Sequence, residues 1–247
     1  MLLIAIIGSL AASCESAPTA PTAEVQQVLA PGGKLRVGLY PGSPGSMIRD
    51  PASGETKGIG YELGRELARR LGVPFEPVIL PATPQILEAL ISGEVDVAFA
   101  GATPARAKNM DFSPPYLEVE DGFLVHSGSP VFTLADVDRT GIRLGVVRGS
   151  TSDGRFSREL KNATVVRASS IVEAIEMLSS RRVDAFATNK ANLYEISDRL
   201  PGSRVLEGAI AVEGISIGVP KGNHVGAAYV RRFAALAWRT CAGSSRK

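Results

Sequence analysis

The chain has 247 residues, 45% of them hydrophobic, and its 27 Lys and Arg nearly balance its 25 Asp and Glu. This length and apolar content are sufficient for one large core or two small ones. The charge balance and the scatter of basic residues give no footprint for nucleic acid, so we expect no nucleic-acid partner. Two cysteines are too few for a disulfide framework. The two cysteines and two histidines have no metal-ligand spacing, so we expect neither a metal site nor a cofactor.

The first twelve residues form an apolar run, M-L-L-I-A-I-I-G-S-L-A-A, which is too short for an ordinary membrane-spanning helix. It has the length of a secretory signal, and A-A-S-C at residues 11–14 resembles a bacterial lipobox. We therefore predict that residues 1–14 are a signal peptide and that Cys14 is lipidated; a plain cleaved signal is the alternative. Residues 15–32, rich in Pro, Ala and Thr, predict a linker. The protein is expected in the periplasm or at the cell surface, held to the membrane only through its lipid anchor.

Short apolar runs alternate with amphipathic segments in the first half of the folded part. The segment 60–71 has apolar residues at positions 63, 67, 68 and 71, a helical spacing, and Gly72 follows it as a stop signal. Thr83 and Pro84 predict the start of another helix, with Thr83 as its N-cap. We expect strands at 34–39, 75–80 and 95–100, and helices at 60–71 and 83–91.

The same alternation continues in the second half. Ser170, with Glu173 three residues later, predicts a capping box at the start of a helix. We expect strands at 141–147, 163–167, 183–188, 204–212 and 214–219, and helices after residue 147 and at 171–181, 191–200 and 225–238.

Strands that alternate with helices predict an α/β fold with mainly parallel sheets covered by helices. The two blocks predict two lobes, residues 33–122 plus 213–247 and residues 126–212. The chain would cross between them twice, near 122–125 and 214–219, which makes a hinge with a ligand cleft between the lobes. A single doubly wound domain is the alternative.

Several strings resemble the family-3 extracellular solute-binding proteins. The most specific is T-P-A-R-A-K-N-M-D-F-S-P-P-Y at 103–116; L-I-S-G-E-V-D-V-A at 90–98, L-G-V-V-R-G-S-T at 144–151 and L-S-S-R-R-V-D-A at 178–185 add to it. The resemblance implies the two-lobed periplasmic-binding-protein fold of type II. It also implies a monomer that captures an amino acid or a related small carboxylate and delivers it to an ABC transporter permease.

Arg106 is the first candidate for ligand binding. It follows a strand end and the small loop Gly101-Ala102-Thr103, the place where open α/β sheets bind ligands. Its guanidinium offers a rigid fork of donors that matches a carboxylate, and the resemblance implies that it binds the ligand's α-carboxylate. The loop can add donors and lets a ligand approach the main chain. The alternative is a surface arginine paired with an acid such as Asp111.

Gly149, Ser150 and Thr151 lie where a strand ends and a helix begins. Exposed N–H groups and hydroxyls at a helix N-terminus bind anions, and the resemblance makes this turn a second clamp on the carboxylate. An ordinary helix cap is the alternative. Arg148, just before the turn, faces either the cleft or solvent.

Asn189 departs from the family, whose amino-acid-binding members usually have an aspartate there for the ligand's α-ammonium. A neutral amide cannot neutralise a buried ammonium. Either another acid replaces it, with Glu118, Glu120 and Asp153 as candidates, or the ligand lacks an α-amine. Tyr40, at the end of the first strand, is the candidate for stacking on the ligand.

Two other functions remain open at this point. A dehydratase on the same fold would need an acid or histidine to move a proton, with Glu118, Glu120, Asp153 and His126 as candidates. A ligand-sensing module is the third possibility. We expect a binding protein and no enzyme, and we give Asp96 and Asp184 structural roles as caps of turns.

Overall fold

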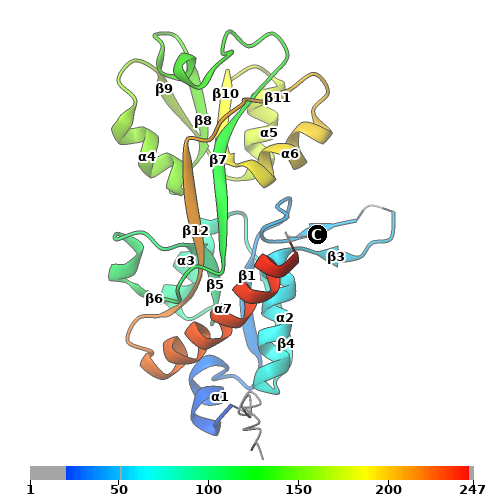
Figure 1. The fold of residues 1–247 in the computed structure, drawn as a ribbon, viewed down its shortest axis with the longest axis vertical. Coiled ribbons are helices and arrows are strands. Elements are labelled where there is room, and N and C mark those ends of the chain that lie inside the picture. The colour runs from blue at the N-terminus through cyan, green and yellow to red at the C-terminus, as the bar shows by residue number, and fades with distance from the viewer. Residues whose placement is uncertain (1–20, 51, 245–247) are drawn as a thin grey trace, which may run out of the picture.

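The computed structural model describes residues 21–50 and 52–244 and places them in two groups of elements joined by two long strands (Figure 1). Lobe 1, drawn below, contains α1 (Ala23–Leu29), β1 (Leu35–Leu39), α2 (Ile59–Leu71), β4 (Phe75–Ile79), α3 (Thr83–Ser92), β5 (Ala98–Gly101), the 3-10 turn η1 (Arg106–Lys108), β6 (Met110–Phe112) and α7 (His224–Ser244). Lobe 2 contains η2 (Leu134–Asp138), β8 (Arg143–Val147), α4 (Thr151–Glu159), β9 (Thr164–Ala168), α5 (Ile171–Ser179), β10 (Ala185–Asn189), α6 (Lys190–Arg199) and β11 (Arg204–Val205).

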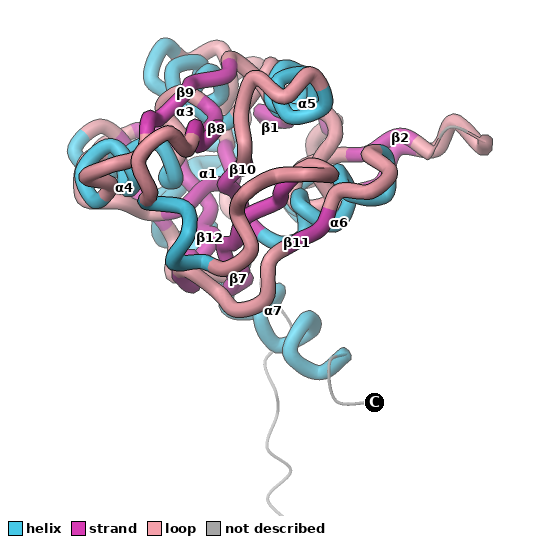
Figure 2. Tube along the Cα trace, turned by 90° about the horizontal axis from the view of Figure 1, so that it is seen from above, coloured by secondary structure: helices cyan, strands magenta, loops and turns pink. Residues whose placement is uncertain are grey.

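The two strands that pass between the lobes are β7 (Leu117–Val125) and β12 (Ala211–Pro220), which pair with each other in antiparallel register. A small hairpin, β2 (Ile48–Arg49) with β3 (Thr56–Lys57), projects sideways from the body, as the view from above shows (Figure 2). The predicted α/β fold with two lobes and two crossings is therefore confirmed.

The sheets combine parallel strands inside each lobe with antiparallel crossing strands. β1 pairs with β4 in parallel, and β8 pairs in parallel with β9 and β10. The larger sheet has the order β5-β12-β7-β10-β8-β9, in which β12 is antiparallel to β5 and β7, and β7 is antiparallel to β10. The carboxyl ends of β5 and β10 thereby meet the crossing strands between the lobes.

Local signals in the sequence account for most helix boundaries. α2 buries Leu67, Ala68 and Leu71 and ends at Gly72, whose φ of 70° is left-handed and suits glycine. Ser170 caps α5 by accepting a hydrogen bond from the Glu173 N–H at 3.1 Å, as predicted.

Part of the segment that we predicted as a linker is helical. Residues 23–29 form α1, which begins after the N-cap Thr22 and buries Val25 and Leu29. These side chains pack in the same core as α7, close to the other end of the chain. Because this packing partner is nearly 200 residues away in sequence, composition alone could not indicate the helix. Cys14 lies outside the described residues.

Several expected boundaries were wrong. The expected strands 204–212 and 214–219 are instead the short β11 and the single long β12, which remains paired with β7 across residue 213. Ala82, and not Thr83, is the N-cap of α3, and the Glu173 carboxylate accepts from Ser169 rather than completing a box with Ser170. Among the described residues, no helix combines the length and apolar character needed to span a membrane.

Asp96 and Asp184 are structural, but they brace strands rather than cap turns. Asp96 accepts from the backbone N–H of Arg36 at 2.8 Å and from its guanidinium at 2.6 and 3.1 Å. Asp184 holds Arg143 in the same way, with distances of 2.8, 3.0 and 2.8 Å. Each lobe therefore fixes the start of its central parallel strand through one buried carboxylate.

Candidate functional site

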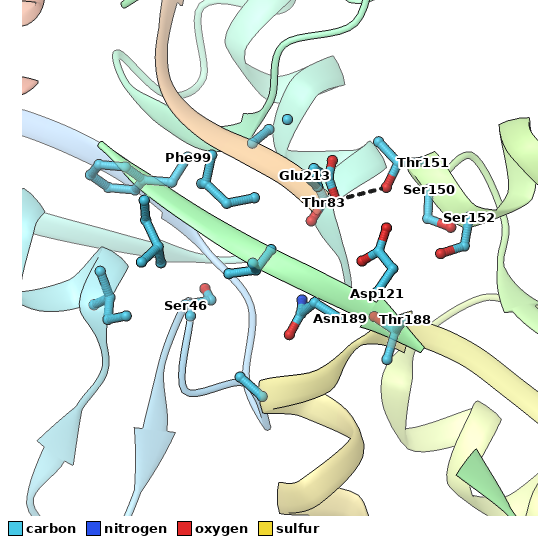
Figure 3. Close-up of a pocket in the computed structure, with 18 of the residues that line it drawn as sticks. Ser46, Thr83, Phe99, Asp121, Ser150, Thr151, Ser152, Thr188, Asn189 and Glu213 are labelled. Atoms are coloured by element: carbon cyan, nitrogen blue, oxygen red, sulfur yellow. Dashed lines mark hydrogen bonds between the residues drawn. The ribbon is translucent and has the colours of Figure 1, made fainter. Parts of the chain in front are cut away.

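Two adjoining cavities lie where the lobes face each other. The inner cavity is lined by ends of β1, β5 and β10, by the crossing strands and by the first turn of α4; the outer one continues over the loop after β5 and along α4. The two share one set of lining residues, namely Gly101, Arg106, Asp121, Ser150, Thr151 and Glu213. Side chains from both lobes and from the hinge thus converge on one space (Figure 3).

Arg106 bridges the two lobes. Its guanidinium donates to the Gly101 carbonyl at 3.0 Å in its own lobe and to the Gly149 carbonyl at 3.4 Å in lobe 2. Burial lowers the pKa of Arg106, and the nearby Glu213 carboxylate opposes that shift. Asp111 is not its partner, since that carboxylate binds Lys221 and the Gly222 N–H on the surface.

The turn before α4 supplies the facing wall. Gly149 has a φ of 73°, a left-handed conformation that favours glycine, and its carbonyl faces Arg106. The Ser150 hydroxyl caps α4 by accepting from the Asp153 N–H at 3.1 Å, and the Thr151 hydroxyl donates to Glu213 at 3.1 Å. The turn is therefore both a helix cap and a wall of the cavity, and its exposed end suits an anion.

The other predicted site residues lie in the same two cavities. Ala102 and Thr103 line the outer cavity, and the Thr103 hydroxyl accepts from the Arg106 N–H at 3.3 Å. Tyr40 and Asn189 line the inner cavity. The structure thus brings together the nine predicted ligand-binding residues, and Arg148 stays exposed, outside the residues that line either cavity.

The acids expected to replace an aspartate at position 189 lie away from the inner cavity. The Glu120 carboxylate binds Lys190 at 2.6 Å on the outer face of β7, and Glu118 on that face is exposed. Asp153 binds Arg167 and the Gly149 N–H within lobe 2. None of the three faces the inner cavity, and His126, the remaining proton-transfer candidate, is also outside both cavities.

The acids that do face the cavity are Asp121 of β7 and Glu213 of β12, which our reading of the sequence missed. Burial and the nearby Glu213 raise the pKa of Asp121 to about 6, while Arg155 opposes the shift. Burial also raises the pKa of Glu213, against the Thr151 hydrogen bond and the charge of Arg106. Glu213 lies over Gly101, where a Cβ would stand 1.8 Å from its Oε1, so any larger residue at position 101 would require the Glu213 side chain to move.

A signal for both acids exists in the strand pattern. In L-E-V-E-D-G-F-L-V, positions 117, 119 and 121 lie on one face and 118 and 120 on the other. Asp121 therefore shares the inward face with Leu117 and Val119, where a charge is unexpected. Glu213 shares one face of β12 with Ile215 in the same way.

Aromatic side chains line the lobe 1 end of the inner cavity. Phe99 and Tyr116 pack edge to face with ring centroids 5.7 Å apart, and Tyr40, which follows β1, lines the same cavity. Within the described residues, no group of three or more acidic, histidine or cysteine side chains is arranged to hold a metal ion.

Several known proteins are similar to this chain in sequence or in fold. The ABC transporter glutamine-binding protein GlnH of Bacillus subtilis (strain 168) is 28% identical over 180 residues, which cover 71% of this chain and 66% of that protein. The L-arginine-binding protein of Pseudomonas aeruginosa is 26% identical over 242 residues, which cover 90% of this chain and 86% of that protein. The crystal structure of the solute receptor for L-cysteine of Neisseria gonorrhoeae superimposes with a TM-score of 0.77 at 25% identity, over 90% of this chain and 93% of that one.

These relatives are binding proteins, which confirms the prediction of a binding protein rather than an enzyme. The family model of the bacterial extracellular solute-binding proteins, family 3, matches residues 35–233, nearly all of the described chain. The chain belongs to the bacterial extracellular solute-binding proteins of family 3.

Proposed function

We propose that this protein is the amino-acid-binding component of an ABC importer. It acts as a monomer whose lobes, residues 33–122 plus 213–247 and residues 126–212, close over the amino acid and present it to the permease. Glutamine and arginine, for which relatives are named, are the first candidates. The observation that supports this proposal is that Arg106 of lobe 1 and the first turn of α4 in lobe 2 line one cavity.

The two lobes would share the ligand's α-carboxylate. The Arg106 fork offers two parallel donors from lobe 1, and the Thr151 N–H in the first turn of α4 offers a donor from lobe 2, since the Ser150 N–H is already bonded to the Val147 carbonyl. A group bound by both lobes stabilises the closed form, because neither lobe alone supplies all the donors. Gly101, Ala102 and Thr103 add main-chain and hydroxyl groups, and Tyr40 packs against the ligand's carbon chain.

A thermal-shift screen tests the proposal directly. The purified protein without its signal segment should be stabilised by L-glutamine, L-arginine or a related amino acid. A concentration 100-fold above Kd adds about 2.7 kcal/mol, which corresponds to an upward shift in Tm of several degrees. Failure of all twenty common amino acids to raise Tm, with no binding by calorimetry, would exclude this function.

We also propose that Cys14 carries the lipid that holds the protein at the membrane. Expressed in a bacterial host, the wild-type protein should sediment with membranes, and its N-terminal peptide should carry a lipid adduct by mass spectrometry. Cys14→Ser should lose the adduct and the sedimentation. The matched variant Cys241→Ser should keep both; equal behaviour of the two variants would refute the anchor.

A further inference from the structure

The inner cavity carries an excess of negative charge. The charged side chains that line it are Arg106, Asp121 and Glu213. A ligand carboxylate on Arg106 would leave two acids facing a space from which water is largely displaced. A buried charge without a partner is costly, so this space suits a ligand that also carries a cation.

Asp121 is the less satisfied of the two acids. It is 6% exposed, and within the described part of the chain no hydrogen bond reaches its carboxylate. Figure 3 shows this carboxylate pointing into the cavity toward the first turn of α4. Glu213, by contrast, accepts the Thr151 hydroxyl and lies beside Arg106.

The strand register places Asp121 next to Asn189. The two residues are direct partners across β7 and β10, so their side chains stand on the same face of the sheet. The Asn189 side chain accepts from the Asn192 N–H at 3.0 Å and caps α6. The Asn189 side chain is neutral and already hydrogen-bonded, so Asp121 is the acid at this end of the cavity.

We propose that Asp121, on the crossing strand β7, holds the α-ammonium group of the bound amino acid. This assignment rests on the amino-acid binding proposed above and adds a specificity: the ligand must have a free α-amine. The carboxylate on Arg106 and the ammonium on Asp121 would then connect lobe 1 to the hinge itself.

Paired ligands test this assignment by calorimetry. We would measure L-glutamine and L-arginine against their desamino analogues, which keep the carboxylate and the side chain. Wild type should prefer the amino acid that it binds by about 100-fold over its desamino analogue, because the analogue leaves Asp121 unpaired. In Asp121→Asn this preference should fall to about threefold or less, mainly because the variant binds the amino acid more weakly than wild type does.

The chain offers two matched comparison variants. Glu120→Gln changes the neighbouring acid on the outer face of β7 and should keep the wild-type preference. Glu213→Gln should weaken the binding of the amino acid and of the desamino analogue by similar factors. Loss of the preference in Glu213→Gln but not in Asp121→Asn would overturn the assignment.

Exchange of the two partners gives a stronger test. Aspartate is as good an N-cap as asparagine, so Asn189→Asp should preserve the cap of α6. The double variant Asp121→Asn with Asn189→Asp should therefore recover at least about tenfold of the lost amino-acid affinity. No recovery, in a variant that melts like wild type, would mean that Asp121 acts through something other than its charge at this position.

Dependence on pH supplies an independent readout. The charged groups that surround the cavity side of Asp121 are Glu213 of β12, Arg155 of α4 and Arg106 of η1; Lys190 of α6 is engaged by Glu120 on the outer face. An ammonium needs the ionised carboxylate, and with a pKa of about 6 its ionised fraction falls about tenfold from pH 7 to pH 5. Wild-type affinity should fall accordingly and Asp121→Asn should show a much smaller change, the remainder arising from Glu213.

The outcomes separate the two proposals. If no amino acid binds wild type, the proposed function fails. If amino acids bind and the desamino analogues bind equally well, or Asp121→Asn retains the preference, the function stands and the assignment of Asp121 is wrong.

Discussion

Replacement of Arg106 by alanine should weaken amino-acid binding by about 100- to 1000-fold, the largest effect expected of a single cleft variant. The guanidinium is held between the Gly101 and Gly149 carbonyls and is partly buried, so its charge-assisted interaction with a carboxylate is strong. Among the described residues it is the only cationic side chain that lines the inner cavity. Calorimetry with L-glutamine and L-arginine measures the loss. Arg106→Lys keeps the positive charge but lacks the planar fork of donors, so its affinity should lie between those of wild type and Arg106→Ala.

Arg148→Ala is the matched control for this variant. Arg148 is exposed and lies next to the same turn but outside both cavities, so its removal should change Kd by less than about threefold. Equal losses in the two variants would indicate a general electrostatic effect and would refute a specific role for Arg106. Unchanged affinity in Arg106→Ala would remove the site assignment altogether.

The second large effect concerns stability. Asp96→Ala should lower the free energy of unfolding by about 3 kcal/mol, because Asp96 is only 5% exposed and its carboxylate accepts three hydrogen bonds from Arg36. Asp184→Ala should cost somewhat less, about 2 kcal/mol, since the side chain of its partner Arg143 is 43% exposed and can be hydrated. Urea unfolding checks both values, fitted lobe by lobe if two transitions appear.

Glu76→Gln provides the surface comparison. The Glu76 and Lys34 side chains form an ion pair and are 39% and 46% exposed, so solvent screens the interaction and the cost should stay below about 1 kcal/mol. A loss in Glu76→Gln equal to that in Asp96→Ala would contradict the reasoning from burial.

The cavity-lining residues that the sequence predicted share one property: each belongs to a local pattern. Ser150 and Thr151 are recognisable because a helix cap has a sequence signature. Arg106 follows a buried strand and a loop of small residues within the string 103–116. That these residues line one cavity was expected from the two-lobed fold. No local feature of either segment predicts it.

Asp121 and Glu213 were missed for the opposite reason. Glu118, Glu120 and Asp153 are equally acidic in the sequence, and only strand register decides which acids point inward. A shift of one residue would exchange the faces of β7 and place Glu120 in the cavity. The juxtaposition of Asp121 with Asn189 depends in the same way on the pairing of two strands about 65 residues apart.

The sequence by itself determined the alternation of strands and helices, the two lobes, the caps of α4 and α5 and the arginine of the cleft, because these features arise from periodicity and from short-range hydrogen bonding. Only the tertiary structure decided that α1 packs on α7, that β12 runs unbroken through the hinge, and which acids face the inner cavity. These are contacts between distant segments, whose free energy comes from burial and register across the whole fold rather than from any local run of residues.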